Sequence, residues 1–215
     1  MEIFTREGLI TLLYTLPALL ISLSVHEYAH ALMAYKLGDV NQKIRGRLTL
    51  DPFKHIDPMG FICMLLFRVG WGKPVMVDDR NFKNRARGTM LTALAGPLSN
   101  FILALLLTII YKILIEVGVF TIATTGALSI VADMLSIAIS FNIVFGVFNL
   151  IPLPPLDGSK VLAYFLPQKL RGYMYTLERY SFIIIIVLFC TNLSSLIINP
   201  AYNAIAKLLN WILNL

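Results

Sequence analysis

The residues best suited to chemistry in this chain are His26, Glu27 and His30, in the sequence His-Glu-Tyr-Ala-His. Residues four apart stand above one another on a helix, so the two imidazoles point the same way. That spacing suits two nitrogen ligands on one zinc ion, with the intervening glutamate beside the water bound to the metal. The pattern therefore predicts a zinc site in which Glu27 acts as a general base.

The segment that must position these residues is unusual for such a site. Residues 9–35 form an apolar stretch long enough to cross a bilayer, where ionisable side chains are costly and indicate function. The 215-residue chain is 58% hydrophobic and 14% charged, whereas soluble domains are about half apolar and a quarter charged. Length and composition predict one membrane domain, residues 1–215.

The other apolar segments predict a helical bundle in the membrane. Residues 90–115, 127–151 and 181–198 are each expected to cross it. The apolar run 61–67 is too short, since a crossing helix needs roughly 20 residues, and both of its flanks are basic. We interpret it as a re-entrant segment whose two ends lie on one side. Pro200 is expected to break the chain before residues 201–215, which are interpreted as a short or interfacial helix.

The basic residues predict how the bundle is oriented. If the N-terminus is outside, the loops that hold 15 of the 18 Lys and Arg residues all lie in the cytoplasm, as the positive-inside rule requires. This distribution between apolar segments explains the net charge of +6 better than nucleic-acid binding does. We expect a multi-pass protein of the plasma membrane with its active site toward the cytoplasmic side.

A catalytic zinc usually takes three protein ligands, so a third donor is needed. The candidates are His55, which lies in a polar loop, and the acidic residues Glu116, Asp133 and Asp157. His30 lies about 10 Å along its helix from Lys36 and therefore near the cytoplasmic end. Asp157 follows the end of segment 127–151 on that same side, whereas the other two acidic residues belong to the far half of the membrane. Topology therefore favours Asp157.

The sequence around Asp157 agrees with this assignment. Residues 149–158 are rich in proline, which blocks helix continuation, and irregular backbone at membrane depth is tolerated where protein or water surrounds it. The alternative is that Asp157 only caps the helix that follows. That alternative leaves the separate face with two histidines unexplained.

One stretch has the pattern of a strand. In residues 44–50, apolar or small residues alternate with polar ones, which is the period of a half-buried strand. Residues 74–77 could pair with it, so the expected fold class is an all-α polytopic transmembrane helix bundle with a re-entrant loop and a small β-hairpin. The alternative for residues 44–50 is a basic loop at the interface.

Taken together, these motifs resemble the site-2 protease family of intramembrane zinc metalloproteases, in a minimal form without an added regulatory domain. The segments that carry the resemblance cover most of the chain in the expected order, and they are residues 26–30, 46–52, 55–58, 95–100 and 149–158. The resemblance implies that His26, His30 and Asp157 bind one Zn²⁺ and that Glu27 activates water. It also implies that a strand-bearing re-entrant loop handles the substrate, a transmembrane helix of another protein within the bilayer.

Further residues receive expected roles. Asn149 lies in the same irregular segment as Asp157 and is assigned to the substrate or the oxyanion, which needs a donor besides the metal. The candidates for substrate binding are Gly46, Arg47, Leu48, Thr49, His55 and Asn100. Asn100 could equally form a helix–helix hydrogen bond, and His55 could serve a structural role at the interface.

Two alternatives to proteolysis use the same residues. Histidines on a transmembrane helix also serve zinc transport, but a transporter favours repeated sets of ligands across the membrane, and this chain has three histidines. A zinc-binding scaffold without activity would have no need of Glu27. The sequence therefore favours hydrolysis of peptide bonds within or near transmembrane segments.

Overall fold

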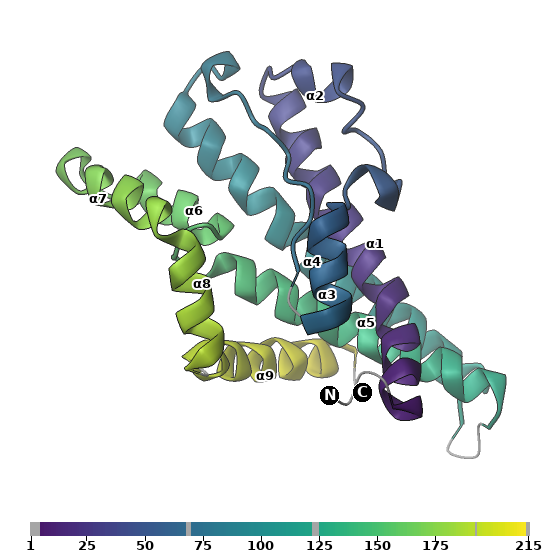
Figure 1. Ribbon diagram of the computed structural model, residues 1–215. Coiled ribbons are helices and arrows are strands. Elements are labelled where there is room, and N and C mark those ends of the chain that lie inside the picture. Colours follow the sequence, from purple (N-terminus) through teal and green to yellow (C-terminus); the bar gives the residue numbers. More distant parts are fainter. Residues whose placement is uncertain (1–4, 68–69, 122–124, 192, 214–215) are drawn as a thin grey trace.

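The computed structural model describes residues 5–67, 70–121, 125–191 and 193–213. Three long helices pack against one another: α1 (Arg6–Lys36), α4 (Arg85–Glu116) and α5 (Ala127–Leu150) (Figure 1). Within the described residues, these are the helices long and apolar enough to cross a membrane. The spans expected at residues 9–35, 90–115 and 127–151 are therefore confirmed as helices, within a few residues at each end.

Local capping explains where two of these helices begin. The Thr5 side chain accepts a hydrogen bond from the Gly8 amide at the start of α1, and Asn84 accepts one from the Arg87 amide at the start of α4. Both helices continue through a proline, Pro17 and Pro97, which neighbouring helices make tolerable in a membrane bundle.

Short elements connect α1 to α4: α2 (Asn41–Ile44), the 3₁₀ turn η2 (Pro52–Lys54), α3 (Pro58–Phe67) and the 3₁₀ turn η3 (Asp79–Asn81). The two flanks of α3 meet, because Ile56 and Gly72 form an isolated antiparallel bridge and the Lys73 amide donates to the His55 carbonyl at 2.8 Å. The backbone on either side of α3 is therefore in contact, whereas the re-entry of residues 61–67 into a membrane stays a prediction.

The β-hairpin expected from residues 44–50 and 74–77 is wrong. The described residues form no β-strand, and residues 45–50 are turns and bends that follow α2. The Gly46 amide donates to the Lys43 carbonyl, the Arg47 amide donates to the Gln42 carbonyl, and Gly46 has a φ of 63°. These features are those of a glycine that terminates a helix. The alternating pattern therefore came from a helix end and the loop after it.

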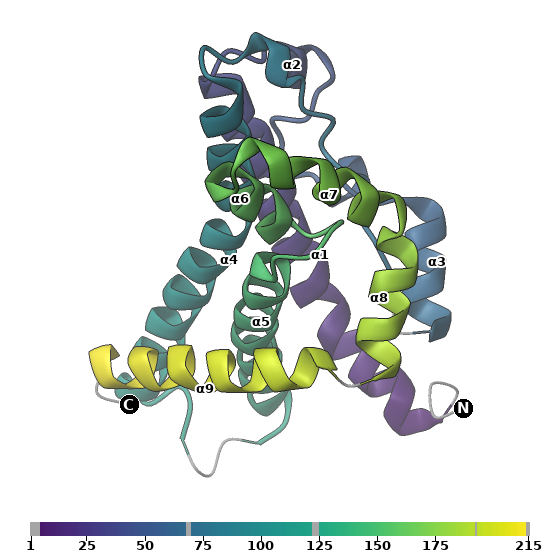
Figure 2. The ribbon, with the colours of Figure 1, turned by 90° about the vertical axis from the view of Figure 1, so that its left-hand side faces the viewer.

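Among the described residues of the C-terminal part, the helices are α6 (Asp157–Phe165), α7 (Gln168–Arg179), α8 (Ser181–Cys190) and α9 (Leu193–Leu213). Figure 2 shows α6 and α7 toward the end of the bundle that carries α2, whereas α9 crosses its opposite part, on the side of the two termini. The side chain of Leu209 in α9 packs against Ala104, Ile143 and Val147 of α4 and α5.

Two expectations for this region are wrong. Residues 181–198 do not form one crossing helix, since α8 ends at Cys190 and α9 runs in a different direction (Figures 1 and 2). The 10 residues of α8 are about 15 Å long, half the thickness of the hydrocarbon core. Pro200 does not break the chain either, because it lies inside α9.

Candidate metal centre

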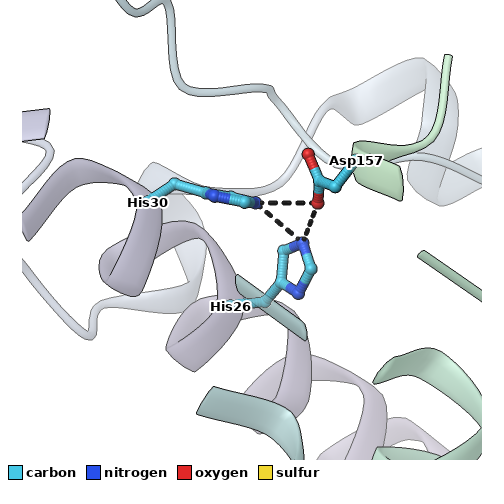
Figure 3. Close-up of side chains that lie close together, drawn as sticks. All are labelled: His26, His30 and Asp157. Atoms are coloured by element: carbon cyan, nitrogen blue, oxygen red, sulfur yellow. Dashed lines mark hydrogen bonds and ion pairs between the residues drawn. The ribbon is translucent and has the colours of Figure 1, made fainter. Parts of the chain in front are cut away.

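Helix α1 and the start of α6 bring three potential metal ligands together (Figure 3). The His26 Nε2 and His30 Nε2 atoms lie 3.0 Å apart, and they lie 3.2 and 3.0 Å from the Asp157 Oδ2 atom. All three residues are buried. The two histidines expected to share a face therefore do so, and the carboxylate expected to join them is present.

The spacing of these three atoms fits a zinc ion. Ligand atoms at about 2.0 Å from a tetrahedral zinc lie roughly 3.3 Å from one another, close to the 3.0 to 3.2 Å found here. Two imidazoles with one carboxylate also form a donor set typical of catalytic zinc, with the fourth position left for water or substrate.

Asp157 is placed by the irregular segment that precedes α6. It is the first residue of that helix, where Leu156 is the N-cap and no side chain caps the amides. Burial raises the pKa of Asp157, but its interactions with the imidazoles of His30 and His26 outweigh burial and hold the pKa well below its usual range. Lys160 lies 3.6 Å from its other carboxylate oxygen. The carboxylate is thus directed at the histidines and does not act as a helix cap.

Each imidazole is held by a partner on α4. The His30 Nδ1–H group donates to the Thr92 carbonyl at 2.7 Å, and His26 Nδ1 lies 2.7 Å from Asn100 Oδ1. Both contacts leave Nε2 facing Asp157, and such outer partners commonly orient the imidazoles that bind a metal.

Glu27 contacts the segment that follows α3, at Val75. Its Oε2 atom accepts a hydrogen bond from the Val75 amide at 3.0 Å and lies 3.9 Å from Arg47 Nη2. The buried Arg47 guanidinium also donates to the carbonyls of Lys54 and Lys73. Arg47 therefore ties both flanks of α3 to the carboxylate expected to act as the base.

The remaining predicted residues lie outside this cluster. His55 is fully buried and donates from Nε2–H to the Thr49 carbonyl at 2.7 Å, while burial lowers the pKa of its imidazole. The side-chain NH₂ group of Asn149 donates to the Phe145 carbonyl of its own helix at 3.0 Å. Gly46 is exposed, and Leu48 is half-buried beside it.

Residues without a catalytic side chain complete the centre, and the sequence reasoning did not identify them. A Cβ atom on Gly96 would lie 2.4 Å from His30 Nε2 and 2.6 Å from His26 Cε1. Thr92 and Val75 contribute backbone atoms, which no side-chain pattern reveals. Asn142 contacts Asn100, and its polarity within an apolar run was the one signal available.

A model of the family described as Peptidase family M50 matches residues 14–191 of this chain. The chain belongs to this family. The membership expected from the motifs, that of the site-2 proteases, is therefore confirmed.

Three curated relatives of this M50 peptidase carry names that indicate a zinc metalloprotease. "Putative zinc metalloprotease YwhC" of Bacillus subtilis is 40% identical over 205 residues, which are 95% of this chain and 92% of the relative. "Putative zinc metalloprotease Rip2" of Mycobacterium tuberculosis is 31% identical over 175 residues, 79% of this chain and 64% of the relative. Its namesake in Mycolicibacterium smegmatis is 32% identical over 180 residues, 80% and 64% of the two chains. No solved structure matches.

Proposed function

We propose that this protein is an intramembrane zinc endopeptidase that hydrolyses peptide bonds within or near transmembrane segments of other membrane proteins. The observation that carries the proposal is the cluster of His26, His30 and Asp157, whose two histidines lie with Glu27 on α1, a helix long enough to cross a bilayer. In this proposal, the three ligands together hold one Zn²⁺ per chain. Ionisable groups at such depth indicate function.

The chemistry divides between the metal and the chain. If His26, His30 and Asp157 bind a zinc ion, it would supply a Lewis acid that lowers the pKa of water beside Glu27. Glu27 takes a proton from that water as general base and returns it to the leaving amine. The Val75 amide and Arg47 hold the carboxylate in place for both transfers. We keep Asn149 as a donor to the substrate or the oxyanion, which requires its amide to turn away from Phe145.

The substrate and its approach are part of the same proposal. A helical transmembrane segment of the substrate must unwind near Glu27, because its carbonyls are otherwise engaged in helix hydrogen bonds. We propose that α3 and its two flanking segments enter the plasma membrane from the cytoplasmic side. The exposed Gly46 and the half-buried Leu48 and Thr49 beside it are then available to contact the substrate.

The experiment compares membranes of cells that express the parent protein, Glu27→Gln or His26→Ala. Proteomics of chain termini should find new ends within or near transmembrane segments with the parent protein and about 10²- to 10⁴-fold fewer with Glu27→Gln, the usual contribution of a general base. Elemental analysis of the purified proteins should find zinc in the parent and Glu27→Gln and little in His26→Ala.

Two outcomes would contradict the proposal. Turnover of Glu27→Gln near that of the parent would require another base. Identical termini in all three membranes, together with zinc uptake by proteoliposomes that contain the parent protein, would point to transport.

A further inference from the structure

A chain of buried amides connects His26 to a third helix. Asn100 of α4 lies 2.7 Å from His26 Nδ1 through its Oδ1 atom, and its Nδ2 atom lies 2.9 Å from Asn142 Oδ1 of α5. Asn100 and Asn142 are 0% and 1% exposed. Polar groups buried this deeply are costly unless they are hydrogen-bonded, so each of these two side-chain amides must find its partners inside the protein.

Two backbone carbonyls determine the direction of the hydrogen bonds that link Asn142, Asn100 and His26. The Asn142 Nδ2 atom faces the Ala138 carbonyl at 2.9 Å, and the Asn100 Nδ2 atom faces the Ser22 carbonyl at 3.2 Å. A carbonyl accepts and cannot donate, so each amide must direct its NH₂ group at its carbonyl. The oxygen of Asn142 then faces Asn100, and the oxygen of Asn100 then faces His26.

This direction fixes the tautomer of His26. Because Asn100 presents an oxygen, His26 must carry its proton on Nδ1 and keep the lone pair on Nε2. Nε2 is the atom that faces His30 and Asp157. The chain of amides therefore selects the form of His26 that binds a metal, and it also holds the plane of the ring.

We propose that Asn100 and Asn142 are positioning residues for the metal, with Asn142 acting on His26 through Asn100. The proposal rests on the zinc site of the proposed function and adds to it a path from α5 to a ligand. Asn142 donates to α5 and accepts from α4, so it holds the Asn100 amide at the distance that His26 needs.

The test measures the affinity of the purified, full-length protein for Zn²⁺ by competition with a chelator. Asn100→Ala should weaken binding about 10- to 100-fold, as the loss of an outer partner of a metal ligand usually does. Asn142→Ala should weaken it about 3- to 10-fold, the effect of losing one net hydrogen bond. The double variant should bind Zn²⁺ no more weakly than Asn100→Ala, since Asn142 acts only through Asn100.

Ser140→Ala is the matched control. Ser140 lies on α5 two residues from Asn142, and its hydroxyl bonds Tyr202 of α9 at 3.0 Å. Its loss removes a contact between helices that does not lead to the metal, so affinity for Zn²⁺ should be unchanged. If Asn142→Ala fails to fold, Asn142→Leu of similar volume replaces it, and thermal unfolding of the zinc-free proteins separates folding from binding.

The possible failures are distinguishable. Parent affinity in Asn142→Ala or Asn142→Leu, or a double variant that shows the product of both single effects, overturns the chain of positioning residues and leaves the zinc site intact. A parent protein that binds no Zn²⁺, or His26→Ala with unchanged affinity, overturns the zinc site and this inference with it.

Discussion

The candidate metal centre depends on a residue that has no side chain, Gly96. Gly96 lies on α4 directly opposite the two imidazoles, and any larger residue would occupy their space. The closeness of α4 to α1 also brings the Thr92 carbonyl to His30. The absence of a Cβ atom at position 96 therefore leaves the space that the imidazoles of His26 and His30 occupy against α4.

Gly96→Ala should weaken Zn²⁺ binding about tenfold or more, because the rings must move away from the geometry set by their partners. The helix itself should form at least as well, since alanine is the better helix former. Chelator competition measures the affinity. Gly172→Ala is the control, because a Cβ atom there meets nothing within 4 Å. Equal affinity in both variants would show that the rings do not lie against α4.

At the scale of elements, one carboxylate ties the end of α1 to the chain before α4. Asp39 is fully buried and accepts hydrogen bonds from the amides of Asn41 and Asp78 and from the side chains of Gln42 and Asn81. Burial raises the pKa of Asp39, but these hydrogen bonds outweigh burial and lower it below its ordinary value. The segment 75–81, whose Val75 amide donates to Glu27, is thereby anchored at Asp78 and Asn81.

Asp39→Asn should weaken the anchoring of this segment, because the NH₂ group of the new asparagine would face N–H groups that can only donate. Hydrogen exchange of the amides of residues 75–81 should be faster in the variant at neutral pH. The lowered pKa stabilises the folded parent above about pH 4, and that contribution is lost as the pH falls through the folded value. The difference between parent and variant should therefore shrink in acid.

Asp51→Asn provides the control for this prediction. Asp51 is exposed and accepts a hydrogen bond from the Phe53 amide, a role that asparagine also fills. Equal exchange in parent, Asp39→Asn and Asp51→Asn would show that Asp39 does not anchor the segment.

The parts that the sequence predicted are those with a strong local signal. Three long apolar runs gave the main helices, and the spacing of His26 and His30 gave a shared face. The hairpin failed because a glycine at a helix end, Gly46, produced an alternation like that of a strand. The chain through Asn142 and the space above Gly96 arise only when α1, α4 and α5 pack together, so no local pattern contained them.

The whole molecule has its basic connecting segments toward one end of the bundle. The loop before α4 and helix α7 both lie on the side of α2, away from the C-terminal end of α4 and from α9 (Figure 2). If this end is cytoplasmic, the positive-inside rule holds for the folded protein. The metal centre then lies nearer the cytoplasm.

Single cysteines at Lys83, Lys169 and Thr121 in a background without Cys63 and Cys190 test this orientation. An impermeant maleimide added to intact cells should label only the Thr121 position, and labelling of the other two should require opened cells. Labelling of the Lys83 and Lys169 positions from opposite sides would contradict this orientation, because the loop before α4 and helix α7 would then lie on different sides of the membrane.

The two imidazoles differ in how far evolution can adjust them. His30 is held by the backbone carbonyl of Thr92, which remains under any substitution at that position. His26 is held through the side chains of Asn100 and Asn142, which a single codon change alters. A selection for weaker zinc retention or for another metal ion should therefore enrich changes at positions 100 and 142 and leave position 92 free to drift.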